Sequence, residues 1–318
     1  MRIALILDPL AKLKPWKDSS VAMMRAARRR GHTCIALLPE SLRAHSEGGQ
    51  VTVWAEGHVL QVHDDDAHWY DAGARECWPL HAFDAVIQRK DPPFDAEYLY
   101  ATHLLETAVR SGARVFNHPR ALRDYNEKLA ILRFADWTTP TCVSRESARL
   151  REFVREHGDV ILKPLDGMGG SSIFRVSLQD PNLSVILETI TRHDQETVMA
   201  QRYIPEIVHG DKRILLINGE PLPYALARIP MAGETRGNLA AGGRGVAQAL
   251  TARDRQIAEA VGPQLRADGL LLVGLDVIGD YLTEVNVTSP TCMVEIAAQT
   301  DCQPAELFLD ALEQACGH

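Results

Sequence analysis

The stretch DVILKPLDGMGGSSIFRV at residues 159–176 decides the fold that we expect for this chain. Its apolar start indicates a buried strand that ends at Lys163, and a second strand is predicted over residues 173–176. The loop between the strands contains three glycines, at Gly167, Gly169 and Gly170. A lysine that leads into such a loop suits a polyphosphate, because its ammonium group meets the oxygens while backbone amides approach closely. An ordinary hairpin with a solvent-facing lysine is the alternative interpretation.

The composition is that of a globular protein with an acidic balance of charge. The chain has 318 residues, 46% of them hydrophobic, and its 34 basic and 42 acidic residues give a net charge of −8. That length suffices for about two domains. The charge argues against nucleic acid or an anionic membrane as the main partner. The apolar start is interrupted at Asp8-Pro9, too early for a signal peptide or a membrane span.

The cysteines and histidines do not predict a metal centre. No CxxC pair exists among Cys34, Cys77, Cys142, Cys292, Cys302 and Cys316. In a chain of this length we expect free thiols in a reducing cytoplasm, with Cys292 a buried thiol rather than a nucleophile. An acidic run at residues 64–66 is flanked by His58, His63 and His68. Their i, i+5 spacing fits neither a helix face nor a strand face, which favours a solvated loop.

Residues 1–122 are predicted to form an N-terminal domain with an open α/β sheet. Its predicted elements are strands at 2–7, 34–38, 85–88 and 114–116 and helices at 19–30 and 97–110, the first capped by Asp18. Strand, helix and strand at this spacing form a βαβ unit, which makes the strands parallel. The loop after the first strand has no glycine, which excludes the dinucleotide-binding fingerprint. A further hairpin is expected, with its turn at Glu56-Gly57.

The rest of the chain is predicted to form a smaller unit that contains the glycine loop and then a larger body. A helix from about 120 to 134 is expected to carry Asn126-Glu127-Lys128. In the larger body, Asn218-Gly219 indicates a hairpin. The loop at 229–245 is rich in glycine and contains two arginines, which favours a functional lid over a disordered segment.

Three oxygen-bearing side chains, Asp276, Glu284 and Asn286, lie in an otherwise apolar hairpin predicted around Gly279-Asp280. Burying carboxylates there is costly unless a positive charge compensates them. Ligands that are all oxygen suit Mg²⁺ rather than Zn²⁺. The alternative places these carboxylates on solvent-facing positions of an edge strand.

The register of this hairpin gives a specific prediction. A plain two-residue turn would pair Asp276 with Thr283 and leave Glu284 on the opposite face. A longer loop or a β-bulge pairs Asp276 with Glu284 and keeps Asn286 on the same face. We predict the second register.

Four motifs together resemble one family. They are Asn126-Glu127-Lys128, the KPLDGMGG loop from Lys163, ETRGNLAAGGRG at 234–245 and TEVNVTSP at 283–290. The set resembles the bacterial type of glutathione synthetase, a member of the ATP-grasp superfamily of carboxylate–amine ligases. The likeness spans nearly the whole chain, from LDPL at 7–10 to SPT at 289–291. It departs at Val294, where the family often has arginine.

The resemblance implies an ATP-grasp fold of the α/β (α+β) class, with ATP between two antiparallel sheets. The implied domains are an N-terminal substrate domain at 1–122, a lid domain at 123–203 and a C-terminal catalytic domain at 204–318. The family is also commonly homotetrameric, which the residues themselves do not indicate.

The resemblance also implies roles for individual residues. Those implied to bind ATP are Lys128, Lys163, Gly167, Gly169, Gly170, Gln201, Tyr203, Ile204 and Asp211. The arginines implied to serve the substrates and phosphates in catalysis are Arg213, Arg228, Arg236 and Arg244. The metal positions, for Mg²⁺ or alternatively Mn²⁺, are Asp276, Glu284 and Asn286. The positions implied to bind the substrates are Lys17, Arg89, Asn286 and Ser289.

The implied activity is the ATP-dependent ligation of γ-glutamylcysteine and glycine through an acyl phosphate, which gives glutathione, ADP and phosphate. Positioning and charge neutralisation would supply most of the catalysis. The loop at 229–245 would keep water from the acyl phosphate. One alternative is another ATP-grasp ligase, such as a D-alanine–D-alanine ligase. A second is a nucleotide-binding regulatory module that has lost catalysis.

Overall fold

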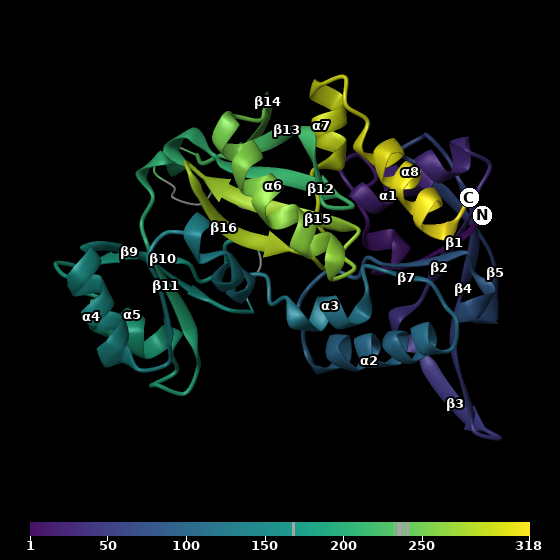
Figure 1. The fold of residues 1–318 in the computed structure, drawn as a ribbon, viewed down its shortest axis with the longest axis horizontal. Helices are drawn as coiled ribbons and strands as arrows, with labels where there is room; N and C mark the ends of the chain where they lie inside the picture. The colour runs from purple at the N-terminus through teal and green to yellow at the C-terminus, as the bar shows by residue number, and fades with distance from the viewer. Residues whose placement is uncertain (167–168, 232, 234–236, 238, 240–241) are drawn as a thin grey trace.

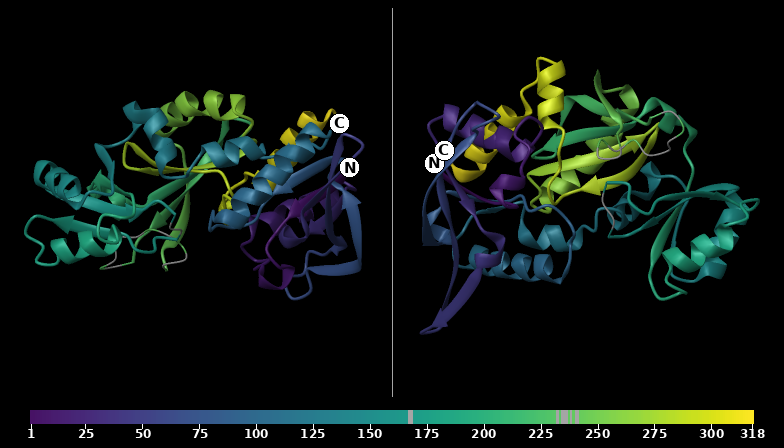
Figure 2. Two further views of the ribbon diagram at one scale, coloured as in Figure 1. Left: turned by 90° about the horizontal axis from the view of Figure 1, so that it is seen from below. Right: turned by 180° about the vertical axis from the view of Figure 1, so that it is seen from behind.

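The computed structural model describes residues 1–166, 169–231, 233, 237, 239 and 242–318. Within these residues the strands form three sheets that follow one another along the chain (Figure 1). The second sheet and its helices stand at the end of the molecule opposite to the chain termini, as both views in Figure 2 show. In the described part of the chain, no helix is long and apolar enough to cross a bilayer.

The first sheet is mixed and has a parallel centre. Its strands are β1 (Arg2–Ile6), β2 (Thr33–Leu37), β3 (Arg43–Glu47), β4 (Gln50–Val62), β5 (Tyr70–Pro79), β6 (Ala85–Gln88) and β7 (Val115–Phe116). They lie in the order β3-β4-β2-β1-β6-β7, and β5 pairs with β4. The predicted parallel strands are confirmed for β2-β1-β6-β7, and β4 adds an antiparallel extension beside β2.

Helices cover both faces of this sheet. α1 (Ser19–Arg29) and α8 (Pro304–Cys316) pack on the face that contains Ile3 and Leu5, and α2 (Ala96–Arg110) packs on the other. α1 begins where predicted, because the Asp18 carboxylate accepts hydrogen bonds from the backbone N–H groups that follow it. Since α8 is the last element, the C-terminus returns to the first sheet and lies beside the N-terminus (Figure 1).

The hairpin predicted with its turn at Glu56-Gly57 is wrong. Residues Gln50–Val62 form the single strand β4. Gly57 lies opposite Leu37 of β2, and a Cβ at this glycine would stand 2.0 Å from the carbonyl oxygen of Ala36. The glycine therefore permits a close approach of two strands rather than a turn.

The second sheet is small and antiparallel. Its strands β8 (Thr141–Ser144), β9 (Asp159–Pro164), β10 (Phe174–Ser177) and β11 (Val198–Arg202) lie in the order β10-β9-β11-β8. α4 (Ser147–His157) and α5 (Leu183–Ile190) bury one face of it in a separate apolar cluster. The two strands predicted on either side of the glycine loop are confirmed as β9 and β10.

The third sheet is also antiparallel and carries α6 (Ala252–Ala267) on one face. Its strands β12 (Asp211–Ile217), β13 (Glu220–Ile229), β14 (Arg244–Ala249), β15 (Leu272–Ile278) and β16 (Tyr281–Asn286) lie in the order β14-β13-β12-β15-β16. The predicted hairpin at Asn218-Gly219 is confirmed, with positive φ at both residues. α7 (Met293–Gln299) follows the sheet and leads into α8.

The helix predicted from about 120 to 134 is interrupted. α3 (Pro119–Asp124) ends before a separate 3₁₀ segment (Leu129–Trp137) begins. Between them, the Asn126 side-chain oxygen accepts the N–H groups of Lys128 and Leu129 at 3.2 and 3.0 Å. The carbonyl of Glu127 accepts the N–H of Val285 in β16 at 2.9 Å. The Asn126 side chain thus satisfies N–H groups at the start of the following segment, and the Glu127 carbonyl is used by β16 instead of a helix, so the predicted helix is divided in two.

One asparagine joins the first and third sheets. The Asn117 side-chain amide follows β7 and donates to the carbonyls of Leu272 and Val287 at 2.8 and 2.9 Å. Its oxygen accepts the N–H of Leu272 at 2.9 Å. Because α8 also packs on the first sheet, elements from both ends of the chain form one body there. The division into domains at residues 122 and 203 stays our proposal.

Candidate active site

A cleft of about 650 Å³ lies between the second and third sheets and extends to the loops at the edge of the first. β9 and β11 form one wall, and β12, β13, β15 and β16 form the other. Apolar side chains at Ile161, Ile173, Ile207 and Ile278 line it together with many charged groups. A cleft of this size, with apolar walls and convergent polar groups, suits a nucleotide and small substrates.

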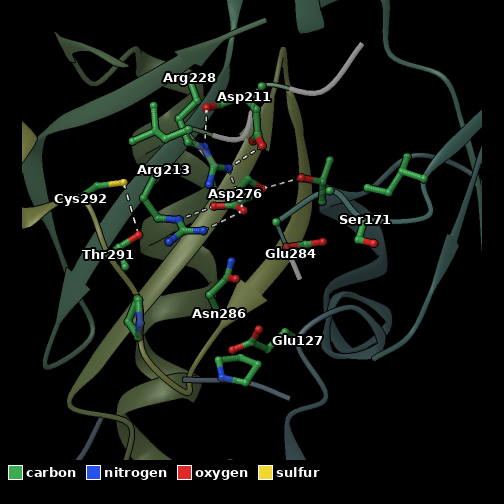
Figure 3. Close-up of a pocket in the computed structure, with 18 of the residues that line it drawn as sticks. Glu127, Ser171, Asp211, Arg213, Arg228, Asp276, Glu284, Asn286, Thr291 and Cys292 are labelled. Carbon is green, nitrogen blue, oxygen red and sulfur yellow. Dashed lines mark hydrogen bonds and ion pairs between the residues drawn. The ribbon is translucent and has the colours of Figure 1, made fainter. Parts of the chain in front are cut away.

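The wall from the third sheet carries a network of alternating charges (Figure 3). Strand register places Arg213 opposite Asp276 and Asp211 opposite Arg228. Arg213 Nε and Nη2 donate to the two Asp276 oxygens at 2.5 and 3.1 Å. Arg228 Nη2 lies 2.8 Å from Asp276 Oδ2 and also pairs with Asp211. These contacts supply the positive charge that the sequence required beside Asp276.

The network fixes the charge of Asp276. Burial alone would raise the pKa of Asp276, but the guanidinium groups of Arg213 and Arg228 outweigh burial and hold it well below its usual range. For Asp211, burial raises the pKa, with the nearby Asp276 adding to the rise and Arg228 opposing it. Asp276 is therefore an anion, with two cations held against it.

The predicted register of the carboxylate hairpin is confirmed. Asp276 pairs with Glu284 because the ladder between β15 and β16 shifts by a bulge just after Asp276. Asn286 pairs with Gly274, and its side-chain N–H donates to the Gly274 carbonyl at 3.2 Å. The Asn286 amide therefore presents its other side to the cleft, on the same face as the two carboxylates (Figure 3).

The three oxygen donors fit a hard divalent ion. Asp276, Glu284 and Asn286 all line the cleft and offer carboxylate and amide oxygens, the ligands that Mg²⁺ takes in proteins. The two Asp276 oxygens accept three hydrogen bonds from arginines, and a carboxylate has about four acceptor sites. One site is left for an ion.

Two lysines face these donors from other parts of the chain. Lys163 of β9 donates to the Thr283 carbonyl of β16 at 3.2 Å, so it crosses from the second sheet to the third. Lys128 Nζ lies 3.6 Å from Glu284 Oε1. Both side chains are buried. Burial lowers the pKa of Lys163, with Lys128 acting in the same direction and Glu284 opposing.

The predicted nucleotide residues of the second sheet line the same cleft. Gly169 and Gly170 do so with positive φ, at 64° and 81°. Gln201, Tyr203 and Ile204 line it at the end of β11, where the Gln201 amide donates to Thr141 Oγ1 at 3.2 Å. Gly167 lies outside the described residues.

The remaining predicted site residues are spread more widely. Lys17 and Ser289 line the cleft, with Ser289 bonded to Asp91. Arg89 is buried behind the wall, where it donates to Ser20 Oγ and to the Pro290 carbonyl, both at 3.0 Å. Arg244 is exposed at the start of β14 and is not among the described residues that line the cleft. Arg236 lies outside the described residues.

Sequence reasoning missed the part that Glu127 plays. Its Oε1 accepts the N–H groups of Val287 and Thr288 at 3.0 and 3.1 Å and the Thr288 hydroxyl at 2.8 Å. Burial raises the pKa of Glu127, and the nearby Glu284 adds to the rise. Glu127 belongs to the predicted Asn126-Glu127-Lys128 motif, but no role was predicted for it. Its hydrogen bonds to Val287 and Thr288 show that it holds the chain just after β16.

Two further residues escaped prediction. Gly274 faces Arg213, and a Cβ there would lie 2.8 Å from Arg213 Cδ, so only glycine leaves room for the guanidinium. Glu295 of α7 lines the cleft, and its Oε2 is buried without a hydrogen-bond partner among the described residues. Cys292, by contrast, is buried as predicted, and burial raises the pKa of its thiol.

Two family models together match most of the chain. Residues 127–301 match the profile of the prokaryotic glutathione synthetase ATP-grasp domain, and residues 1–123 match its N-terminal domain. A glutathione synthetase of Bordetella parapertussis is 58% identical over 323 residues, which cover 100% of both chains. One of Pseudomonas aeruginosa is 55% identical over 314 residues, covering 98% of this chain and 97% of the relative.

Solved structures resemble the chain in fold. D-cycloserine synthetase DcsG superposes with a TM-score of 0.67 at 18% identity over 99% of each chain. The ATP-grasp ligase PsnB, complexed with minimal precursor, Mg and ADP, gives a TM-score of 0.63 at 17% identity, covering 99% of this chain and 98% of PsnB. At these identities the likeness shows the ATP-grasp fold alone.

Proposed function

Because this chain belongs to the prokaryotic glutathione synthetase family of ATP-dependent ligases, we propose that the cleft between its second and third sheets is where γ-glutamylcysteine and glycine are joined. The enzyme uses ATP to ligate these substrates into glutathione. We expect different residues to contact the nucleotide, the metal ion and the substrates. We assign the triphosphate to the centre of the cleft, and γ-glutamylcysteine and glycine to the end near Lys17 and Ser289.

The nucleotide is assigned to the walls of β9, β11 and the glycine loop. Lys128 and Lys163 bind phosphate oxygens, because both ammonium groups are buried beside the carboxylate wall. The backbone amides at Gly169 and Gly170 cover the phosphates. Gln201, Tyr203 and Ile204 contact the adenine end of the nucleotide. Asp211 contributes by holding the Arg228 side chain in place through their ion pair.

A divalent ion is assigned to Asp276, Glu284 and Asn286, and we propose that it is Mg²⁺, with Mn²⁺ as the alternative. When bound, such an ion neutralises phosphate charge. The protein's own contribution is to hold the three donors on one face of the β15-β16 hairpin, where the bulge brings them together. Arg213 and Arg228 then hold Asp276 ionised and in position.

The chemistry follows from the charges around the cleft. A carboxylate reacts with an amine only after activation, so the cysteinyl carboxylate of γ-glutamylcysteine takes the terminal phosphoryl group of ATP as an acyl phosphate. The amine of glycine then attacks and phosphate leaves. The positive groups of Lys128, Lys163, Arg213 and Arg228 stabilise the charge on the transferring group and on the tetrahedral intermediate. Arg236 and Arg244 stay predictions as further cations of the 229–245 loop.

The observation that carries this assignment is that Lys163 reaches the strand of Glu284 from a different sheet. The test is ADP release from a panel of acids and amines that includes γ-glutamylcysteine with glycine and two molecules of D-alanine. We expect turnover with the first pair, and we expect Glu284→Ala to abolish it while circular dichroism stays unchanged. Glu220→Ala, an exposed glutamate of the same sheet, is the matched control. Normal turnover in Glu284→Ala would overturn the metal assignment.

Two further properties are proposed. We propose a cytoplasmic location, which the six unpaired cysteines support. We also retain the homotetramer that the family resemblance implies, and sedimentation equilibrium of the purified enzyme tests it. A monomer at micromolar concentration would contradict that proposal.

A further inference from the structure

A second cluster of ligand-type side chains lies away from the cleft, where the chain passes from β4 to β5. His63 Nε2 is 2.8 Å from Asp71 Oδ2, and His68 Nε2 is 3.0 Å from Asp71 Oδ1. The two imidazole rings are stacked, with centroids 5.2 Å apart. One ligand atom from each of the three residues lies within 4.8 Å of the other two. None of the three lines the ATP cleft.

Sequence spacing could not predict this cluster, because the chain folds back between its members. The His63 N–H donates to the Trp69 carbonyl at 2.7 Å, which closes the loop, and Trp69 is buried in the core of the first sheet. Asp71 is then held opposite Gln61 in the β4-β5 ladder. Loop closure thus brings His63, His68 and Asp71 together, although the i, i+5 spacing of the histidines fits neither a helix nor a strand face.

The loop is fixed by contacts that do not involve the three side chains. Arg25 of α1 donates to the His63 carbonyl and to Asp66, both at 2.9 Å. Arg28, one turn later, pairs with Asp64. These bonds neutralise part of the acidic run and hold the backbone that presents the histidines. A ligand that binds there has little loop entropy to overcome.

We propose that His63, His68 and Asp71 bind one divalent transition-metal ion of the Zn²⁺ class. Two imidazole nitrogens and one carboxylate oxygen suit Zn²⁺, Co²⁺, Ni²⁺ or Cu²⁺, whereas Mg²⁺ prefers oxygen alone. A tetrahedral ion with bonds of about 2.1 Å needs its ligand atoms roughly 3.4 Å apart. The N···O separations of 2.8 and 3.0 Å are to the two different Asp71 oxygens, and the three ligand atoms lie within 4.8 Å of one another, so the side chains must rearrange to take up this spacing. The ion replaces two N–H···O hydrogen bonds, and a solvent molecule completes its shell.

The cluster is reachable from solvent. The His63 side chain is 26% exposed, and those of His68 and Asp71 are 64% and 55% exposed. Exposure gives an ion an entry path and leaves room for a fourth ligand. Substitutions of His68 or Asp71 should also change the stability of the fold little, because the two exposed side chains are not part of the core.

The test is calorimetric titration of the full chain with Zn²⁺ in excess Mg²⁺, in a Cys77→Ser background that removes the exposed thiol. We expect one tight ion per chain. His68→Ala and Asp71→Ala should each weaken binding about tenfold or more. His45→Ala, which removes another exposed histidine of the same sheet, should leave the affinity unchanged.

Two further measurements make the result specific. Co²⁺ should give the visible absorption of a four-coordinate ion in the background protein and lose it in His68→Ala. Zn²⁺ should raise the melting temperature of the background protein but not of Asp71→Ala. Equal Zn²⁺ affinity in all the variants, or no binding in the background protein, would overturn the proposal and leave a hydrogen-bonded His–Asp–His cluster.

Discussion

At the scale of single residues, Lys163 links the second and third sheets, and its surroundings in the cleft shift its pKa. It is buried, it donates to the Thr283 carbonyl, and burial lowers its pKa. Phosphate oxygens favour the protonated form, so ATP must raise that pKa again. ATP binding should therefore take up a proton once the pH approaches the lowered pKa.

The first prediction concerns pH. ATP affinity should fall as the pH rises through the lowered pKa of Lys163, which lies below the ordinary lysine value of about 10.4. Calorimetry at pH 7.5 to 10 in buffers of different ionisation enthalpy measures both the affinity and the proton uptake. Lys163→Arg keeps its charge throughout this range and should show neither effect, whereas Lys163→Met should weaken ATP at least tenfold at every pH. Equal pH profiles in the wild type and Lys163→Arg would contradict the assignment.

A second residue-scale prediction concerns Glu295. Its buried oxygen has no hydrogen-bond partner among the described residues, and it lines the cleft near Lys17 and Arg213. γ-Glutamylcysteine and glycine each carry an amino group that can donate a hydrogen bond to it. Glu295→Gln should therefore raise the KM of one of them about tenfold or more while the KM of ATP stays constant, because a charged hydrogen bond contributes about 1.5–3 kcal/mol. Unchanged KM values for both would show that the carboxylate has only a local structural role.

At the scale of elements, the charge network on the third sheet should also stabilise the fold. Asp276→Asn removes the anion that compensates Arg213 and Arg228, both of them buried. Leaving buried charges uncompensated costs about 3 kcal/mol or more. Urea unfolding of the variant and the wild type measures this loss. A loss below about 1 kcal/mol would mean that water or the other acids already compensate the arginines.

The pH dependence of that loss has a definite sign. The folded pKa of Asp276 lies below its unfolded value of about 3.9, so its contribution is complete above the unfolded pKa and disappears as the pH falls through the folded one. Asp276 also raises the pKa of Asp211, which adds stability to the wild type as the pH falls towards 5. The stability difference between wild type and Asp276→Asn should therefore not shrink between pH 8 and about 5, and should shrink only at lower pH. A difference that vanishes near pH 6 would contradict the depressed pKa.

Local patterns predicted most of the elements but failed where tertiary contacts decide. The βαβ spacing, the Asp18 cap and the Asn218-Gly219 turn each carry their own signal, and the structure confirms them. Glu56-Gly57 is a sequence typical of a turn. Gly57 nevertheless lies within β4, where the close backbone of Ala36 in β2 leaves no room for a side chain. The break at Asn126 likewise depends on the partner that Glu127 finds in β16, which is far away in sequence.

Some residues of the candidate site could be predicted from the sequence and others could not. The carboxylate hairpin could be predicted, because buried acids in an apolar strand require a cation and a defined register, and both are found. Arg89 and Arg244 could not be placed, because nothing in a local pattern says whether an arginine faces a cleft or packs behind its wall. Glu295 belongs to a helix after the last motif and carries no signal of its own.

At the scale of the whole molecule, Asn117 ties the first sheet to the third. Its side chain satisfies three buried backbone groups, on Leu272 and Val287. Asn117→Ala should lower the free energy of unfolding by about 3 kcal/mol, since each unsatisfied buried group costs about 1–3 kcal/mol. Asn117→Asp keeps the acceptor and loses both donors, so it should also destabilise the fold. Denaturant unfolding checks both variants, and a wild-type midpoint in either would contradict the proposed linkage.

In the proposed active site, residues from two sheets meet at one triphosphate. Crystals grown with Mn²⁺ and a non-hydrolysable ATP analogue test this directly through the anomalous difference map. We predict a Mn²⁺ peak about 2 Å from oxygens of Asp276, Glu284 and Asn286, with the analogue's phosphates in contact with Lys128 and Lys163. A metal peak away from the β15-β16 hairpin, or phosphates that contact neither lysine, would contradict the account.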